Sequence, residues 1–596
     1  MINEFCKQPL WEVSGILADV AMGRRPADLV IRDVRLVNVC THELIPHVDV
    51  AVAMGRIAMV GDCAACIGEG TTVVDAAGRY LAPAFMDGHI HIESSMLTAG
   101  EYARAVLPHG TSAIFMDPHE ICNVLGFEGV RCMLQDAART PLKAILTTPS
   151  CVPAVPGFED TGASVGPEDV AETMQWHECA GLGEMMNFPG IVYSDARTHA
   201  IVGETLRAGK IVTGHFSIPE TGPMLNAYVA SGVRCCHEST RAEDALAKMR
   251  LGMYAMFREG SAWHDLKEVA KSITAGEVDT RFACLISDDA HPHTLQSVGH
   301  LDHIVCRAVE EGIDPITAIQ MVTINVAQCF QLDHELGSIT PSKCANMVLL
   351  DDLAHCHVTK VWVDGDLVAE DGRLVTQWTP YVYPRSATHS VHLDPLTEAD
   401  LAIPHEGTAV HARVIGAIGG KTGTVERFAT LPVVDGSVQA DPKQDVLKAF
   451  VFERHHRTGS RGFGFLQGFG IRAGALAQTV SHDAHNLLVV GTNDADMVLA
   501  ANELIRVGGG LVAVQNGRIL GEVPLPIAGL MSDKSLDEMV ALVSDLERAW
   551  SEMGCTLPSP FMTMSIIPLA CLPELRLTNR GLVDCRTFRF VSPILD

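Results

Sequence analysis

Short apolar runs alternate with longer helical patterns between residues 83 and 337. The runs recur at intervals of roughly 20 to 40 residues, a spacing typical of strand–helix units. About 250 residues for eight such units is the usual size of a (β/α)8 barrel, so the pattern predicts an α/β fold of this type. We expect its strands at Phe85–His91, Ser112–Met116, Ala144–Thr148, Leu182–Met186, Ile211–His215, Val233–His237, Met253–Phe257 and Phe282–Asp288.

Two β-rich segments flank this stretch. Residues 29–82 and 338–378 both carry short runs rich in Val, Ile and Leu, separated by turn residues. Segments of one kind on either side of an inserted α/β region predict one small β domain built from both flanks. We therefore divide the chain into an N-terminal helical segment (1–28), this composite β domain, a metal-dependent barrel (83–337) and a C-terminal α/β domain (403–596).

Composition and charge narrow the classes of function. The chain has 596 residues, of which 47% are hydrophobic and 19% charged, which excludes a disordered protein. The net charge of −28 disfavours binding to nucleic acid or to anionic membrane surfaces. No apolar run is long enough for a membrane span, and the first residues do not resemble a signal peptide, so we expect a cytoplasmic protein. Most of the 18 cysteines are expected to be buried and reduced.

Metal-binding side chains end several predicted strands. His89 and His91 are two residues apart at the end of the first strand, so their side chains point to the same face. In a barrel, the ends of later strands open onto that same C-terminal face, where active sites lie. Four further residues end later strands there: Glu184, His215, His237 and Asp288. The sequence therefore predicts one metal centre with six ligands.

The number of ligands indicates two metal ions. A single catalytic zinc ion keeps three protein ligands and a water, whereas four imidazoles and two carboxylates suit two ions that share a bridging carboxylate. A set of nitrogen and oxygen ligands without thiolate fits Mn, Fe or Zn and does not choose between them.

Residues 82–91 (Ala-Pro-Ala-Phe-Met-Asp-Gly-His-Ile-His) resemble the first-strand motif of the amidohydrolase superfamily. Ala84 stands where that motif has glycine, which is a small-for-small change. Ile92–Leu97 and further segments are similar to the bacterial adenine deaminase family within it, over essentially the whole chain. These segments are 117–121, 150–154, 181–186, 236–239, 287–289, 480–486 and 524–531.

The resemblance implies hydrolytic deamination of adenine to hypoxanthine and ammonia, a reaction of purine salvage. A hydroxide bridging two divalent metal ions would attack C6, and Asp288 would carry a proton to the departing amine. Glu184 would be the bridging carboxylate, in the place where many relatives carry a carbamylated lysine. We expect a homodimer that acts on free adenine.

Other residues allow more than one interpretation. His119 and Glu120 follow the second strand and either begin a helix or donate a proton to N1 of the purine. Glu93, Ser94 and Ser95 either cap the first helix, which we favour, or line the substrate pocket. For the cluster containing His482, Asp483 and His485, three roles are open. It either closes over the site, binds a remote metal ion or satisfies the hydrogen bonds of its own loop.

Two alternative functions are compatible with the residues alone. The same barrel chemistry would hydrolyse a cyclic amide or ureide. A catalytically silent module that binds metal or purine is the other class, but a complete ligand set with Asp288 argues against it.

Overall fold

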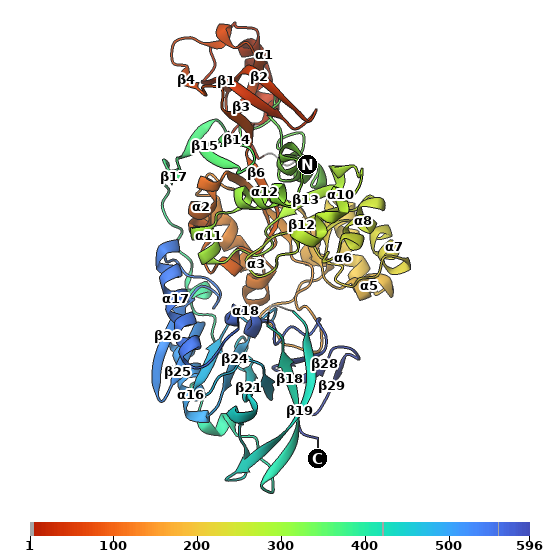
Figure 1. Ribbon diagram of the computed structural model, residues 1–596, viewed down its shortest axis with the longest axis vertical. Coiled ribbons are helices and arrows are strands. Elements are labelled where there is room, and N and C mark those ends of the chain that lie inside the picture. Colours follow the sequence, from red (N-terminus) through yellow and green to blue (C-terminus); the bar gives the residue numbers. More distant parts are fainter. Residues whose placement is uncertain (1–4, 420–421, 558, 596) are drawn as a thin grey trace.

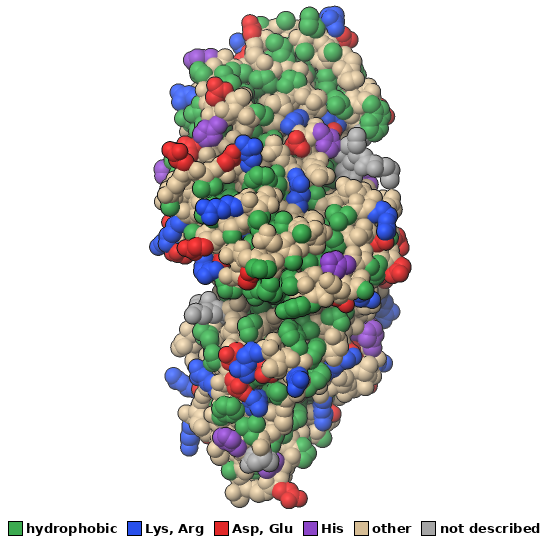
Figure 2. Space-filling view, turned by 90° about the vertical axis from the view of Figure 1, so that its right-hand side faces the viewer, with side chains coloured by type: hydrophobic (Ala, Val, Ile, Leu, Met, Phe, Trp, Pro, Cys, Tyr) green, Lys and Arg blue, Asp and Glu red, His purple; other side chains and the backbone are tan. Residues whose placement is uncertain are grey.

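The computed structural model describes residues 5–419, 422–557 and 559–595. Three regions follow one another along the long axis of the molecule, with a β-rich region at the top of Figure 1, a barrel in the middle and a second α/β region below. Acidic and basic side chains are interspersed over the face drawn in Figure 2, and no extended basic patch is seen there. Within the described residues, no helix has the length and apolar character needed to span a membrane.

The middle region confirms the predicted (β/α)8 barrel. Neighbouring strands are parallel in the order β6 to β13. The barrel closes between its first and last strands, because the backbone N–H of His91 donates to the carbonyl of Asp288 at 3.1 Å and that of Asp288 to His89 at 3.0 Å. The strands are β6 (Phe85–Ile90), β7 (Thr111–Met116), β8 (Lys143–Thr148), β9 (Cys179–Met185), β10 (Ile211–Gly214), β11 (Val233–Cys236), β12 (Tyr254–Arg258) and β13 (Ala283–Ile286).

Helices surround these strands and bury their outer faces, which explains why the strands read as continuous apolar runs. In chain order the helices are α2 (Ala99–Val106), α3 (His119–Ala137), α4 (Pro167–Thr173), α5 (Phe188–Val192), α6 (Ala196–Arg207), α7 (Pro223–Ala230), α8 (Ala242–Arg250), α9 (Leu266–Val269), α10 (Lys271–Thr274), α11 (Pro292–Ser297), α12 (Leu301–Glu310), α13 (Pro315–Met321) and α14 (Ile324–Cys329).

A nine-stranded sheet joins the two flanks of the barrel. Its central pairing is antiparallel, between β5 before the barrel and β14 after it, with Leu81 opposite Leu349. Helix α1 (Leu10–Ala21) packs on this sheet through Val13, Leu17 and Val20. The strands are β1 (Leu29–Asn38), β2 (Glu43–Ala53), β3 (Arg56–Gly61), β4 (Thr72–Asp75), β5 (Tyr80–Pro83), β14 (Met347–Asp352), β15 (His357–Val363), β16 (Asp366–Glu370) and β17 (Arg373–Leu374).

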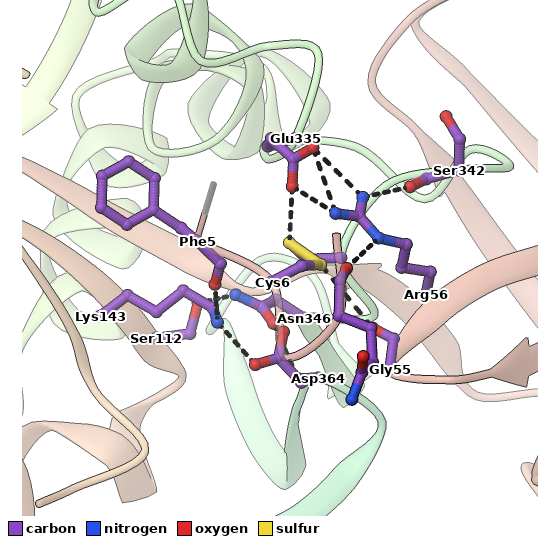
Figure 3. Close-up of a disulfide and its surroundings, with 12 residues drawn as sticks. Phe5, Cys6, Gly55, Arg56, Ser112, Lys143, Glu335, Ser342, Asn346 and Asp364 are labelled. Atoms are coloured by element: carbon purple, nitrogen blue, oxygen red, sulfur yellow. Dashed lines mark hydrogen bonds and ion pairs between the residues drawn. A yellow bond between two sulfur atoms is a disulfide. The ribbon is translucent and has the colours of Figure 1, made fainter. Parts of the chain in front are cut away.

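A disulfide ties the N-terminal segment to the chain beyond the barrel. Cys6 and Cys344 are 338 residues apart in the sequence and are bonded in the structure (Figure 3). We expected most cysteines to be reduced, and this pair is an exception. The sequence did not indicate it, because two cysteines so far apart along the chain carry no sign that they lie close together in the fold. The buried side chains of Arg56 and Glu335 form an ion pair beside it, 2.9 Å between Nη2 and Oε2. Lys143, the first residue of β8, bonds the carbonyl of Phe5, so this linkage lies at the end of the barrel opposite the predicted site.

The C-terminal region contains a second nine-stranded sheet and a three-stranded one. Helix α17 (Leu536–Glu552) contacts α11 and α2 of the barrel, and Ser532 donates its N–H to the carbonyl of Met96 at 2.9 Å. Gly508 ends α16 (Asp494–Val507) with a φ of 88°, so the glycine run serves as a helix C-cap. The strands are β18 (Ala409–Ala417), β19 (Thr424–Val434), β20 (Ser437–Val438), β21 (Val446–Phe452), β22 (Arg461–Gln467), β23 (Ala475–Gln478), β24 (Leu487–Gly491), β25 (Gly510–Gln515), β26 (Arg518–Pro524), β27 (Leu575–Thr578), β28 (Gly581–Asp584) and β29 (Arg589–Phe590).

Candidate metal centre

Two histidines at the end of β6 begin the site. The side chains of His89 and His91 are buried, and their ring centroids lie 4.7 Å apart, edge to face. His91 Nδ1 bonds the carbonyl oxygen of Asp117 at 2.8 Å. Because a carbonyl only accepts, Nδ1 carries a proton, and Nε2 is the ring nitrogen that faces the interior of the site.

Glu184 follows on β9 and connects three histidines. Its Oε2 lies 2.6 Å from His215 Nδ1 and 3.1 Å from His237 Nε2. Its Oε1 lies 3.7 Å from His91 Nε2. One carboxylate therefore reaches imidazoles from β6, β10 and β11, which is the position expected of a bridging ligand.

Asp288 follows β13 and closes the cluster. Its Oδ1 is 3.3 Å from His89 Nε2 and 3.4 Å from His91 Nε2. The ring of His89 also stacks on that of His237, with centroids 4.1 Å apart. The structure thus brings all six predicted ligand residues into one cluster, in which only His215 is half-buried and the others are buried: His89, His91, Glu184, His215, His237 and Asp288.

The carboxylates of this cluster are held in their charged form. Burial opposes the charge of Glu184, but His215 and His237 outweigh it and keep the pKa of Glu184 well below its usual range. Burial also opposes the charge of Asp288, and Arg258 is the largest factor that keeps its pKa well below the usual value. Burial and the neighbouring His89 lower the pKa of His237 to about 4. A neutral imidazole between two carboxylates suits a metal ligand.

The cluster fits metal ions. Ligand atoms of His89, His91 and Asp288 lie within 4.8 Å of one another, and so do those of His89, Glu184 and His237. His89 Nε2 is buried and has no hydrogen-bond partner among the described residues. A buried nitrogen without a hydrogen-bond partner destabilises the folded protein unless a bound ligand or ion interacts with it. Nitrogen and oxygen atoms alone make up this donor set, which matches divalent Mn, Fe or Zn.

An arginine that the sequence analysis did not single out, Arg258, bonds the Asp288 oxygen that does not face the histidines. Arg258 ends β12, and its Nη1 donates to Asp288 Oδ2 at 2.9 Å and to Glu238 Oε1 at 2.6 Å. Its Nη2 donates to Asp265 Oδ2 at 2.7 Å. Oδ2 of Asp288 is therefore engaged, and Oδ1 faces the histidines. The signal was present in the sequence, because Arg258 ends a barrel strand as the ligands do.

Glu93, Ser94 and Ser95 form a short 3-10 helix (η2, Ile92–Ser95) after the histidine pair. The Ser94 hydroxyl donates to the carbonyl of His91 at 2.7 Å, and the Ser95 hydroxyl donates to that of Ile92 at 2.6 Å. Both hydroxyls thus bond nearby carbonyls, and Ser94 Oγ also accepts the N–H of Ala290 at 3.2 Å. The expectation that they cap the next helix is wrong in detail, because Thr98 is the cap of α2.

Glu93 has a different role from the two serines. Its Oε1 accepts the N–H of Ile121 at 3.1 Å, so it caps the distant helix α3. Its Oε2 is buried without a hydrogen-bond partner among the described residues. Burial, together with Glu120, raises the pKa of Glu93 to about 7. Glu93 therefore stays available to a ligand, unlike its neighbours.

His119 and Glu120 begin α3 and lie beside the cluster. His119 Nδ1 is 3.5 Å from Glu184 Oε1 and 3.6 Å from Asp117 Oδ1. The Glu120 side chain is buried, and its Oε2 has no hydrogen-bond partner in the described part of the chain. Both residues thus lie at the helix start and next to the predicted ligand residues.

A loop of the C-terminal region, residues 479–486 between β23 and β24, reaches this same place. His482 Nδ1 is 3.6 Å from Glu120 Oε1, and His485 Nε2 is 4.0 Å from Glu120 Oε2. Asp483 Oδ1 is 3.9 Å from His119 Nε2. Among the three interpretations of this cluster, the structure supports closure over the site. The sequence carried no signal of this contact, because about 360 residues separate the two segments.

Fold and site together define a metal-dependent hydrolase of the (β/α)8 type. Residues 80–368 match the Amidohydrolase family, and residues 421–589 match the Adenine deaminase C-terminal domain. An "Adenine deaminase" of Clostridium botulinum (strain Loch Maree / Type A3) is 66% identical over 594 residues, 99% of each chain. One of Moorella thermoacetica is 54% identical over 99% of each chain, and one of Mesorhizobium japonicum is 45% identical over 98%. The chain belongs to the adenine deaminase family.

Proposed function

We propose that this protein hydrolyses adenine to hypoxanthine and ammonia. The observation that carries the proposal is the cluster of six predicted ligand residues, five of them buried and His215 half-buried, in a chain that aligns with adenine deaminases over its whole length. The relatives share both the barrel and the C-terminal region, and the second of these contributes side chains beside the cluster.

We assign two divalent metal ions, Mn, Fe or Zn, to the cluster. One ion would be held by His89, His91 and Asp288, the second by His215 and His237, with Glu184 shared between them. When bound, such ions lower the pKa of a coordinated water, which supplies hydroxide near neutral pH. Because Glu184 is a carboxylate from the chain itself, the site needs no carbon dioxide to form a carbamate.

Asp288 is the residue that moves protons in the reaction. A water oxygen bonds to C6 of the purine, and N1 takes up a proton so that charge does not accumulate on the ring. The carboxylate of Asp288 accepts the proton of the added hydroxyl and passes it to the amine, and the C6–N bond then breaks to release ammonia. The Arg258 side chain keeps Oδ2 engaged, which orients Oδ1 for this transfer.

The proton for N1 comes from a residue other than Asp288, at the start of α3. Glu120 and His119 are buried next to the cluster and are our candidates for this role. Glu93 lies against the same helix start, and its raised pKa makes it a reservoir for that proton. Ser94 and Ser95 are not assigned to the substrate, since their hydroxyls already bond backbone groups of the protein.

The test compares adenine, adenosine and hydantoin as substrates of metal-loaded protein, with ammonia release as the measurement. We expect ammonia from adenine alone. Opening of hydantoin without release of ammonia from adenine would assign the chain to the cyclic amide hydrolases. No reaction with any of the three, at full metal content, would overturn the enzymatic proposal.

A further inference from the structure

Asp117 follows β7 and lies between the strands that carry two of the predicted ligand residues. Its side chain is 1% exposed. The carboxylate oxygen Oδ2 accepts the backbone N–H of Glu184, on β9, at 2.6 Å. The backbone N–H of Asp117 donates to the carbonyl of Ile90 at 3.0 Å, and its carbonyl accepts Nδ1–H of His91 at 2.8 Å. Asp117 thus bonds two predicted ligand residues that come from different strands.

Strand β9 has a β-bulge at one of these residues. Between two paired positions of β9 and β10, Gly183 and Glu184 of β9 lie opposite the single residue Thr213 of β10. A bulge leaves one residue out of the hydrogen-bond ladder and changes the direction of its side chain. The carboxylate of Asp117 accepts the N–H of Glu184 at this point, so it takes the place of a ladder partner.

The glycine of the bulge makes room for this carboxylate. A Cβ atom at Gly183 would lie 2.5 Å from Oδ2 of Asp117 and 2.8 Å from its Cγ. The φ angle of Gly183 is not in the left-handed region, so the close approach of the carboxylate, and not the backbone conformation, requires a glycine. Any larger residue at position 183 would displace the Asp117 side chain.

The N–H of Glu184 is the group that holds the Asp117 carboxylate. The other oxygen, Oδ1, is buried and has no hydrogen-bond partner among the described residues, and His119 Nδ1 is 3.6 Å from it. Removal of the carboxylate would leave the N–H of Glu184 buried without an acceptor, which costs more than an ordinary hydrogen bond contributes. The main chain at Glu184 would then lose its fixed position.

We propose that Asp117 is a positioning residue of the metal centre, whose carboxylate fixes the backbone of Glu184 so that both oxygens of the bridging side chain face the histidines. The inference rests on the proposed function, because it assumes metal ions at the cluster. The carbonyl of Asp117 supports the same centre by holding the ring of His91. Groups that orient metal ligands in this way contribute about 10- to 100-fold to metal affinity or activity.

The experiment uses full-length protein that is prepared metal-free and titrated with Mn²⁺. Asp117→Ala removes the acceptor, Asp117→Asn keeps an amide oxygen for the N–H of Glu184, and Gly183→Ala displaces the carboxylate without changing it. Metal bound per chain gives the dissociation constants. The electron paramagnetic resonance spectrum of the loaded protein distinguishes two coupled Mn²⁺ ions from isolated ones, and calorimetry gives the melting temperature.

The other end of α3 offers a matched pair of controls. Asp136 is buried, and its Oδ2 accepts the backbone N–H of Gly100 at 2.9 Å. A Cβ atom at Gly100 would lie 2.8 Å from Oδ1 of Asp136. Asp136→Ala and Gly100→Ala therefore disturb the same kind of contact, but this contact joins α2 to α3 and not to a predicted ligand residue.

We expect the Mn²⁺ dissociation constants of Asp117→Ala and Gly183→Ala to rise about 10- to 100-fold, with loss of the coupled spectrum at two ions per chain. Asp117→Asn should stay closer to the wild type than Asp117→Ala, since its amide oxygen still accepts the N–H. The control pair should melt at a lower temperature but keep the affinity and the spectrum of the wild type.

Wild-type metal affinity and spectrum in Asp117→Ala would overturn the role of Asp117, and so would equal losses in the control pair. If Asp117→Ala does not fold, Gly183→Ala decides in the same way. Failure of the proposed function is distinguishable, since the wild type would then bind two ions without releasing ammonia from adenine, and the variants would still decide the role of Asp117. Wild-type protein that binds no Mn²⁺ would overturn both.

Discussion

At the scale of single residues, we predict that a substitution of Asp288 separates metal and substrate binding from proton transfer. Its Oδ1 faces His89 and His91, while Arg258 engages Oδ2. Asp288→Asn retains a carbonyl oxygen for coordination but cannot accept the proton of the added hydroxyl. General acid–base catalysis contributes about 100- to 10,000-fold, so we expect kcat to fall at least about a hundredfold. Steady-state kinetics on samples of known metal content checks this, and a metal-replete variant with wild-type turnover would remove Asp288 from the mechanism.

Glu184 is the residue on which both metal ions should depend. Its two oxygens reach His91, His215 and His237. Glu184→Gln keeps the shape but removes the shared negative charge, so both ions should bind more weakly and activity should become limited by added metal. Metal titration followed by inductively coupled plasma analysis measures this. Two tightly bound ions and normal turnover in the variant would place the bridge elsewhere, and bicarbonate should have no effect on the wild type.

At the scale of elements, the sequence predicted the barrel well because the strands are continuous apolar runs, and several of them end in a candidate ligand residue. The predicted strands overlap β6 to β13 throughout, although β9 begins at Cys179 and not at Leu182. His89, His91, Glu184, His215, His237 and Asp288 were found in this way. Contacts that pair distant segments were not predictable, since neither the Cys6–Cys344 bond nor the approach of Asp483 to His119 leaves a local pattern.

The buried ion pair beside the disulfide, another contact between distant segments, yields a stability prediction. Arg56 and Glu335 are both buried, and three hydrogen bonds join them at the end of the barrel opposite the site. Glu335→Gln leaves the arginine charge without its counter-ion, and breaking a buried pair costs about 3–5 kcal/mol. We expect a lower melting temperature by calorimetry and unchanged kcat per folded molecule.

The control for this prediction is Asp366→Asn, which breaks the exposed pair with Lys7. Exposed pairs contribute about 0–1 kcal/mol, so its melting temperature should stay close to that of the wild type. A Glu335→Gln protein that melts with the wild type would contradict the assigned role of the buried pair.

At the scale of the whole molecule, the candidate site lies between two regions. The barrel supplies the six predicted ligand residues, and the loop 479–486 of the C-terminal region lies against Glu120 and His119. The residues of this loop are held by bonds within the C-terminal region and to the barrel. The match to adenine deaminases extends over both regions and not over the barrel alone.

The most direct test of the account is a metal titration of metal-free, full-length protein with adenine as substrate. Mn²⁺ is added in steps, and ammonia release is followed together with the metal bound per chain. The account predicts that activity rises until two ions are bound, stays constant beyond that point and is lost on chelation. Full activity with one ion per chain, or no ammonia with two, would contradict it.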